Sequence, residues 1–196
     1  MHLQKSARLS GYFTSPKNRG FTLVELMLVI AILGILLAMA VPELEVFTAN
    51  QKTKAAANAI QNGLQLARVE AVKRNQSIAF VLTSDAPVSG AVTAASNGAN
   101  WVVRVRATNE FVQGRSGKEG SSNVTVGATV DGAAFANPIV FNGYGRLATS
   151  PLPGGDILID VANPAGDRPM QIRVNSGGQV RMCDLSLPAT NFQSCG

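Results

Sequence analysis

The sequence predicts an α+β fold in which one long N-terminal helix packs on an antiparallel, β-rich domain. Apolar residues follow a helical period from Phe21 to about Asn75, first as an unbroken run and then as a single stripe. From Gln76 onward the period changes to two, in short runs separated by glycine, proline, asparagine and serine. The chain therefore divides into a basic N-terminal segment, an apolar helix, an amphipathic helix and a β-rich domain, at residues 1–20, 21–41, 42–75 and 76–196.

The basic character of the chain lies mainly in its first 20 residues. This segment holds four cations, Lys5, Arg8, Lys17 and Arg19, and no acid. The whole chain has 17 basic and 12 acidic residues, so removing these four leaves 13 basic against 12 acidic residues. The body of the chain is thus nearly neutral, which argues against nucleic-acid binding driven by net charge.

The apolar run that follows, Phe21 to Val41, is long enough to cross a membrane. Its 21 residues would span roughly 31 Å as a helix, about the thickness of a bilayer core. The four N-terminal cations precede the run, whereas Glu43 and Glu45 follow it. The positive-inside rule then predicts a single pass, with the N-terminus in the cytoplasm and the remaining chain outside it.

Glu25 is the only charged residue inside this run, and a lone carboxylate in hydrocarbon is costly unless it has a partner. A secretory signal cleaved near Ala38-Met39-Ala40 is one interpretation, although the run exceeds a typical signal-peptide core. An uncleaved anchor is a second, but it does not explain the glutamate. In a third, cleavage after Gly20 gives Phe21 a cationic α-amine. In an assembly that amine pairs with Glu25 of a neighbouring subunit and sets the register.

The residues around this cleavage site carry a family resemblance. Lys17-Asn18-Arg19-Gly20, followed by Phe21-Thr22-Leu23-Val24-Glu25-Leu26, resembles the class III leader and methylation site of type IV pilins and type II secretion pseudopilins. Pro42, directly after the apolar run, also matches the family. The resemblance implies that a prepilin peptidase in the bacterial inner membrane cleaves between Gly20 and Phe21 and N-methylates Phe21.

Beyond the apolar run, the helix continues as an amphipathic segment. Pro42 lacks an amide hydrogen and disfavours helix at Val41, so it predicts a kink or local unwinding. Small and aliphatic residues then recur at three- and four-residue steps in one stripe: Ala56, Ile60, Leu64, Ala67 and Ala71. Polar residues follow the same spacing on another face: Lys54, Asn58, Gln61, Gln65 and Arg68. We expect the apolar stripe to pack on a sheet as core.

The β-rich domain is expected to contain short antiparallel strands. Seven runs have a strand-like pattern: Ser77–Thr83, Asn100–Arg106, Asn123–Val130, Pro138–Asn142, Asp156–Ala162, Met170–Asn175 and Gln179–Cys183. Two polar, glycine- and serine-rich stretches, Ser84–Ala99 and Gln113–Ser122, are predicted to be mobile loops.

Two internal segments narrow the resemblance. Ala67–Arg74 and Val140–Arg146 are similar to segments of the GspH/FimT group of minor pilins and pseudopilins. This resemblance implies a minor pilin that takes part in type IV pilus assembly or initiation. A type II secretion pseudopilin, acting in protein export, is the alternative within the same class. Its partners would be other minor and major pilins or pseudopilins, the prepilin peptidase and the inner-membrane assembly platform. Its β-rich domain would be periplasmic before assembly into a pilus or pseudopilus.

Residues suited to catalysis or metal binding are sparse. The only histidine is His2, which the expected cleavage removes, so no Ser-His or Cys-His pair and no histidine ligand remains. Gly143–Ala148 fits a dinucleotide-binding fingerprint, but two prolines follow where that site requires a helix, and a turn between strands is expected instead. We therefore expect no enzyme activity, no cofactor and no metal.

Cys183 and Cys195 are the only cysteines, and both follow the predicted membrane segment. In an oxidising compartment they are expected to form one disulfide, with two free thiols as the alternative. Closing so short a loop would stabilise the fold by about 3 kcal/mol and would mostly hold the C-terminal tail in place.

DNA binding is a second class of function. Some relatives of the FimT type are implicated in DNA uptake through a C-terminal Gly-Arg-x-Arg segment, whereas this chain has Gly178-Gln179-Val180-Arg181 at the matching place. Arg104 and Arg106 share one strand face, as do Gln171 and Arg173 on another strand. With Arg181 these arginines could line a phosphate-contacting surface. The alternative, polar residues on the solvated side of an antiparallel sheet, is more common.

Overall fold

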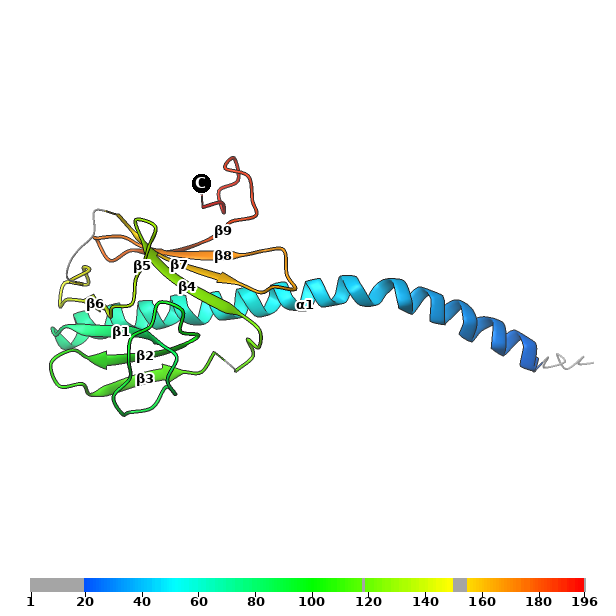
Figure 1. The fold of residues 1–196 in the computed structure, drawn as a ribbon, viewed down its shortest axis with the longest axis horizontal. Coiled ribbons are helices and arrows are strands. Elements are labelled where there is room, and N and C mark those ends of the chain that lie inside the picture. Colours follow the sequence, from blue (N-terminus) through cyan, green and yellow to red (C-terminus); the bar gives the residue numbers. More distant parts are fainter. Residues whose placement is uncertain (1–19, 118, 150–154, 196) are drawn as a thin grey trace, which may run out of the picture. The chain divides into compact units, whose positions relative to one another are not determined.

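The computed structural model describes residues 20–117, 119–149 and 155–195 (Figure 1). The basic leader, except for Gly20, therefore lies outside the described residues. The chain consists of two compact units, residues up to Ala40 and residues from Val41 onward. The division into four segments stays a prediction, but the expected combination of one N-terminal helix with antiparallel sheets is present.

Helix α1 runs from Leu23 to Arg74, close to the predicted range. It ends at Asn75, which has a left-handed backbone conformation (φ 50°) that asparagine tolerates better than most residues. The amide of the next residue, Gln76, donates to the carbonyl oxygen of Ala71 at 3.2 Å and so satisfies one terminal carbonyl. The helix is continuous through Pro42, and the kink predicted there stays a prediction.

In the described part of the chain, nine strands form two antiparallel sheets. Sheet A has the order β3-β2-β1-β6, and sheet B has the order β5-β4-β7-β8-β9. The bounds of sheet A are β1 Ile78–Thr83, β2 Asn100–Val105, β3 Phe111–Arg115 and β6 Ile139–Phe141. Those of sheet B are β4 Thr125–Val130, β5 Ala133–Ala134, β7 Ile157–Ala162, β8 Met170–Val174 and β9 Val180–Asp184. Six of the seven predicted runs contain one of these strands, and the seventh, Gln179–Cys183, overlaps β9, which extends one residue further.

Strand β3 corrects the prediction of a loop over Gln113–Ser122, because Phe111–Arg115 pairs with β2 at the edge of sheet A. Gln113 and Gly114 interrupt the apolar alternation that identifies a strand. Main-chain pairing with an existing edge does not require that alternation. The pairing also shifts register between Val103 and Arg104, as at a β-bulge.

Strand β5 was also missed, although a hairpin signal precedes it. Asp131-Gly132 connects β4 to β5, and both residues have positive φ, 48° and 79°. This is the combination that a tight two-residue hairpin favours. The strand itself has only two alanines, too few for a period to be recognised.

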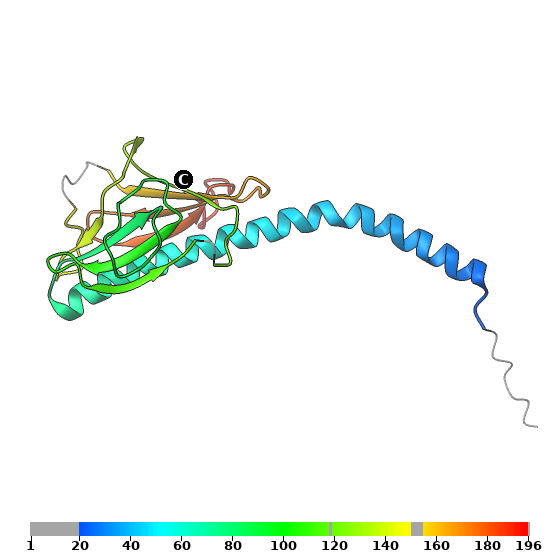
Figure 2. The ribbon, with the colours of Figure 1, turned by 60° about the horizontal axis from the view of Figure 1, so that its bottom comes forward.

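Both sheets lie alongside the second half of α1 (Figures 1 and 2). All five residues of the predicted helical stripe are buried, and they join the inner faces of both sheets in a single core. Phe80 of β1 and Trp101 of β2 stack there with ring centroids 5.7 Å apart. Gly63 of α1 lies against these two rings, so the absence of a side chain lets the helix approach sheet A closely.

The segment Ser84–Ala99 lies over the outer face of sheet A. Ala94 forms an isolated antiparallel bridge with Thr83, at the end of β1. Val92 and Ala94 pack against a small second cluster made of Ala79, Val81 and Val140. The segment predicted as a loop therefore covers part of a sheet face that has its own apolar residues.

Candidate functional site

The N-terminal end of α1 is closed by Thr22. The Thr22 hydroxyl accepts a hydrogen bond from the amide of Glu25 at 3.2 Å, and the Thr22 carbonyl oxygen accepts one from the amide of Leu26 at 3.1 Å. Thr22 is therefore the N-cap, and Glu25 occupies the third helical position, as in the Thr-x-x-Glu arrangement of a capping box. Sequence reasoning missed Thr22, although its spacing from Glu25 is a recognisable signal.

The apolar side chains of the first helical unit are exposed. Their exposed fractions run from 45% for Val29 to 86% for Phe21, and they occur all along residues 21–37. Among the described residues no single straight helix qualifies as a membrane span by length and composition, whereas Leu23–Ala38 and Glu43–Arg74 taken together do. A long exposed apolar surface of this kind marks a site that lipid or another protein covers.

Glu25 lies within this exposed apolar surface. In the described part of the chain its carboxylate has no hydrogen-bond or ion-pair partner, and the contact with Thr22 is made by its backbone amide. Glu25, the residue predicted to set the register of an assembly, can thus pair with a cation that does not belong to the described part of the chain.

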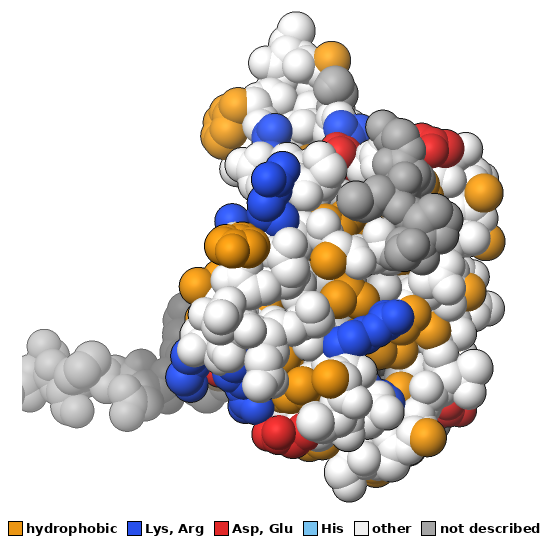
Figure 3. All heavy atoms as spheres, turned by 90° about the vertical axis from the view of Figure 1, so that its left-hand side faces the viewer, with side chains coloured by type: hydrophobic (Ala, Val, Ile, Leu, Met, Phe, Trp, Pro, Cys, Tyr) orange, Lys and Arg blue, Asp and Glu red, His pale blue; other side chains and the backbone are white. Residues whose placement is uncertain are grey.

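The four arginines proposed for DNA contact fall on two different sheets. Arg104 lies on β2 of sheet A and Arg106 directly follows that strand, whereas Arg173 of β8 and Arg181 of β9 face each other in register on sheet B. On the face shown in Figure 3, lysine and arginine side chains are dispersed over several separate places and do not form one stripe. The structure therefore forms two arginine pairs where the sequence predicted one surface.

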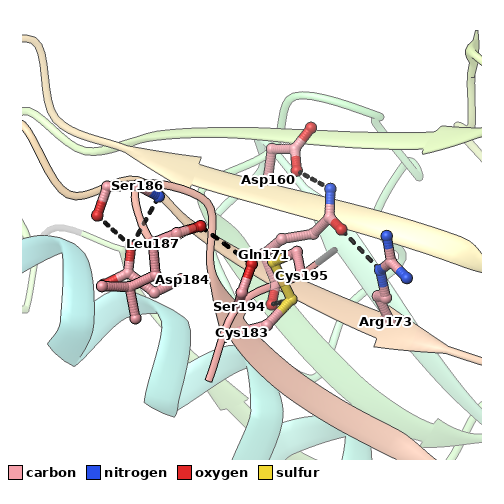
Figure 4. The surroundings of a disulfide bond; sticks show 9 residues. All are labelled: Asp160, Gln171, Arg173, Cys183, Asp184, Ser186, Leu187, Ser194 and Cys195. Atoms are coloured by element: carbon pink, nitrogen blue, oxygen red, sulfur yellow. Dashed lines mark hydrogen bonds between the residues drawn. A yellow bond between two sulfur atoms is a disulfide. The ribbon is translucent and has the colours of Figure 1, made fainter. Parts of the chain in front are cut away.

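Cys183 and Cys195 form the predicted disulfide (Figure 4), with their Cα atoms 5.0 Å apart. Cys183 lies on β9, the last strand of sheet B. The disulfide and a bridge between Asp184 and Ser194 hold the C-terminal tail next to this strand. The tail thereby covers part of an edge that would otherwise be open to pairing with another strand.

Next to the disulfide, a chain of polar side chains crosses the outer face of sheet B (Figure 4). Arg173 Nε donates to Gln171 Oε1 at 2.8 Å, and Gln171 Nε2 donates to Asp160 Oδ1 at 2.8 Å. Arg173 is therefore already engaged, through the amide of Gln171, with a carboxylate of its own chain.

Asp184 is the buried acid at this end of the domain. Burial opposes its ionisation, but hydrogen bonds from the hydroxyl and amide of Ser186 and the charge of Arg168 outweigh that effect. Together they hold the pKa of Asp184 below its ordinary value. Arg168 Nη2 lies 3.0 Å from Asp184 Oδ2.

A second ion-pair network, not predicted from the sequence, stabilises the C-terminal end of α1. Glu70 accepts hydrogen bonds from Arg74 at 2.7 Å and from Lys73 at 3.3 Å, and Arg74 also reaches Glu110 at 2.9 Å. The hydrogen bond from Arg74 is the main reason why the pKa of Glu70 is lowered. The described residues contain no group of His, Cys, Asp and Glu side chains that could hold a metal ion.

Two known families match this chain. The family described as Type II transport protein GspH matches residues 56–178, and the Prokaryotic N-terminal methylation motif matches residues 15–41. The type IV major pilin protein PilA of Myxococcus xanthus (strain DK1622) is 58% identical over 38 residues. That match covers 19% of this chain and 17% of the relative, so the chain resembles this pilin over a small part of its length only.

The fold is similar to that of a solved minor pilin. The type IV minor pilin FimU of Pseudomonas aeruginosa matches with a TM-score of 0.51 and 18% identity, over 76% of this chain and 99% of that one. The minor pseudopilin EpsH of Vibrio cholerae matches with a TM-score of 0.47 and 11% identity, over 69% of this chain and 99% of that one. The GspH match covers more than half of the chain. The chain thus belongs to the GspH family of type II transport proteins, the minor pilin and pseudopilin group predicted from its sequence.

Proposed function

We propose that this chain is a minor pilin that assembles through its N-terminal helix and takes part in the assembly or initiation of a type IV pilus. The observation that carries this proposal is the exposed apolar surface of residues 21–37, with the unpartnered carboxylate of Glu25 in it. In the inner membrane lipid covers this surface, and in the filament the helices of other pilins cover it. The β-rich domain from Gln76 onward is periplasmic before assembly.

Cleavage between Gly20 and Phe21 supplies the partner that Glu25 lacks. The new α-amine of Phe21 remains a cation after methylation, and it lies one helical turn from the glutamate of its own chain. In a staggered assembly it pairs with Glu25 of the neighbouring subunit. Because both charges lie in a low-dielectric helix bundle, leaving either one unpaired costs more than it would in water. The pair therefore favours one register of neighbouring helices.

Mass spectrometry of the chain purified from a cell with a prepilin peptidase tests this proposal. The expected mature protein begins with N-methylated Phe21. A chain that begins at Val41 would instead indicate a secretory signal, and an uncleaved chain would indicate an ordinary membrane anchor. A host without the peptidase serves as the control and should yield the uncleaved chain.

A type II secretion pseudopilin is the alternative within the same family. Its helix and Glu25 would act in the same way, but the filament would be a short pseudopilus that drives protein export. Deletion of the gene distinguishes a minor pilin from a secretion pseudopilin. Loss of surface pili with normal export supports the minor pilin, whereas loss of export with normal pili supports the pseudopilin.

DNA binding is a second candidate, and the specific observation in its favour concerns Arg104, Arg106 and Arg181. Within the described residues, none of their side chains has an acidic partner. The division of the arginines between two sheets and the engagement of Arg173 count against it. A gel shift with the full chain in detergent, at low and high salt, decides. Binding that weakens with salt supports the candidate, and the absence of a shift at low salt contradicts it.

A further inference from the structure

The β9 edge of sheet B is only partly covered by the C-terminal tail. Strand β9 is the last strand of this sheet (Figure 1), and in antiparallel pairing its residues alternate between bonding β8 and pointing away from it. The amide of Leu185 donates to the carbonyl oxygen of Pro169 on the β8 side, whereas the amide of Asp184 donates to that of Gln193 in the tail. The even-numbered residues of β9 therefore direct their N–H and C=O groups toward the outer edge.

Two residues of this edge have unpaired main-chain groups. Val180 and Met182 are even-numbered, and within the described residues their N–H and C=O groups have no protein partner. The tail pairs with the edge only at Asp184, through the isolated bridge to Ser194. An unpaired edge of this kind can bind an extended segment of another chain, because main-chain hydrogen bonds supply the affinity.

A groove lies beside this edge, between α1 and the inner face of sheet B, and we call it the methionine groove. Its volume is about 340 Å³; Met170 and Met182 form its apolar part, and Gln51 and Lys54 of α1 also line it. Both methionines are only partly buried, at the border of the core. Methionine adapts its shape to different apolar side chains, which suits it to binding surfaces. A strand added to β9 would direct every second side chain toward this groove.

The outer face of the same edge favours an acid. Arg181 is exposed and lies directly opposite Arg173 of β8, and like charges in such a cross-strand pair repel each other. Within the described residues Arg181 has no acidic partner, and Arg173 donates to the neutral amide of Gln171. A carboxylate on an added strand, opposite Arg181, would offset this repulsion. The same arginine discourages pairing with segments that carry no acid.

We propose that β9 is the docking site for an extended segment of a different pilin subunit, in which an acid stands between two apolar residues. The segment adds one strand to sheet B. Its main chain bonds Val180 and Met182, its acid faces Arg181, and its apolar side chains enter the methionine groove. The inference rests on the proposed function, because it names a contact between subunits of a filament.

The edge strands of this chain do not offer such a segment to a second copy. Among the described residues, the edge strands β3, β5 and β6 contain no acid. Antiparallel pairing of β9 with β9 of a second copy would bring two Arg181 side chains together. The run Ile159-Asp160-Val161 has the required pattern, but it belongs to β7, which is already paired on both sides, with β4 and β8. The partner is therefore a chain of different sequence.

Solution NMR of the full chain in detergent micelles, with synthetic peptides as probes, tests the site. The probe is a peptide with blocked ends and the sequence Thr-Val-Glu-Val-Thr, and the control peptide is Thr-Val-Lys-Val-Thr. At about ten times its dissociation constant, the glutamate peptide should slow hydrogen exchange of the Val180 and Met182 amides about tenfold. The Arg181 amide already bonds β8 and should change much less. The lysine peptide should leave all three amides unaltered.

Two variants separate the role of the charge from that of the main chain. Arg181→Ala should bind both peptides alike, because only the preference for an acid is lost, and Arg106→Ala on sheet A is the matched control that keeps the preference. Val180→Pro removes one outward N–H but no bond to β8, and it should weaken binding of the glutamate peptide about fivefold. Equal binding of both peptides by the wild type, or unaltered exchange of the Val180 and Met182 amides, would overturn the inference.

Incorporation into filaments tests the nature of the partner. The double variant Val180→Pro, Arg181→Glu should enter sheared filaments about fivefold less well than the wild type, whereas Arg106→Glu should enter normally. Normal incorporation of the double variant would exclude a pilin as the partner and overturn the inference.

Two further outcomes separate this site from its alternatives. If a duplex oligonucleotide shifts the Arg181 resonances while neither peptide slows the Val180 and Met182 amides, the edge is a nucleic-acid surface and the inference is wrong. If the peptides fail while the same chain begins at methylated Phe21 and enters filaments, the proposed function stands and only this docking site is excluded.

Discussion

Glu25 has two roles that its surroundings make separable. As the third residue of α1, three positions after the Thr22 cap, it occupies the acidic position of a capping box and lies at the end of the helix dipole that favours an anion. As an unpartnered carboxylate among exposed apolar side chains, it is also a candidate for pairing with a cation of another subunit. Glutamine would keep a polar side chain at the third helical position, whereas the interaction with the dipole and the pairing with a cation both require the charge.

Glu25→Gln distinguishes these roles, because glutamine keeps the capping position but removes the charge. We expect the variant to insert into the membrane and to be cleaved normally, but to enter filaments at least about tenfold less well if an ion pair in a low-dielectric site is lost. Quantitative immunoblots of sheared filaments and membranes measure this ratio. Thr22→Val is the control for capping. Normal incorporation of the Gln variant would show that the charge is dispensable.

Asp184 and Glu70 are the two acids whose pKa values are lowered by their surroundings. Their folded-state pKa values lie below those of the unfolded chain, which are near about 4. Both carboxylates therefore stabilise the fold at pH values above the unfolded pKa. That contribution is lost as the pH falls through the folded pKa.

We expect the free energy of unfolding of the wild-type domain to fall as the pH is lowered below about 5. In Asp184→Asn this fall with pH should be smaller. Asparagine cannot carry the charge that Arg168 and Ser186 stabilise. Urea midpoints at pH 7 and pH 3 give the comparison. Asp156→Asn replaces an exposed acid and should leave the slope unchanged. If the urea midpoint of Asp184→Asn changes between pH 7 and pH 3 as much as that of the wild type, ionised Asp184 does not stabilise the fold.

At the scale of elements, the contact between α1 and sheet A depends on small residues. Alanines form much of the buried stripe of the helix, and Gly63 faces the stacked rings of Phe80 and Trp101. A Cβ at Gly63 would lie 2.8 Å from a ring carbon of Phe80 and 3.1 Å from one of Trp101. Because both rings are buried, neither can move aside freely.

Gly63→Ala is therefore expected to destabilise the domain, although alanine favours helix more than glycine does. Overpacking costs about 1 to 3 kcal/mol and the gain in propensity is about 1 kcal/mol, so a net loss of about 1 kcal/mol follows. Chemical denaturation measures it. Gly127→Ala is the matched control, because a Cβ at Gly127 meets nothing within 4 Å. If Gly63→Ala is more stable than the wild type, the rings of Phe80 and Trp101 move aside at little cost.

The two units of the chain differ in where their apolar side chains lie. The residues from Val41 onward enclose their own core between α1 and two sheets, and the C-terminal disulfide holds the tail of that unit. The residues before them expose apolar side chains and have no buried ones among those described. The first unit thus exposes a long apolar surface, whereas the second encloses a core of its own.

A fragment that begins at Glu43 is accordingly expected to be monomeric without detergent and to unfold cooperatively. Its thermal midpoint should match that of the domain in the full chain, because the core lies entirely within the fragment. Differential scanning calorimetry measures the thermal midpoints of the fragment and of the full chain. A second pair of measurements, after reduction of the disulfide, uses the same two proteins. A fragment that aggregates or lacks a transition would show that the first unit contributes to the fold of the second.

Local spacing along the chain was sufficient to predict several features of the protein. The leader and Glu25 identified the family, the three- and four-residue steps from Ala56 to Ala71 identified the buried face of α1, and alternation located seven strands. These inferences succeed because the period of apolar residues reflects which side of a helix or strand is removed from water.

How these elements meet could not be predicted from spacing and is visible in the folded protein. It separated the arginines of β2 from those of β8 and β9, placed Ser84–Ala99 over sheet A, and left Arg104 Nε buried without a partner in the described residues. It also added β3 and β5, whose pairing depends on backbone groups. Every residue except proline carries the same main-chain donor and acceptor, so the choice of neighbouring strand has no local signature in the sequence unless a tight turn such as Asp131-Gly132 joins the two strands.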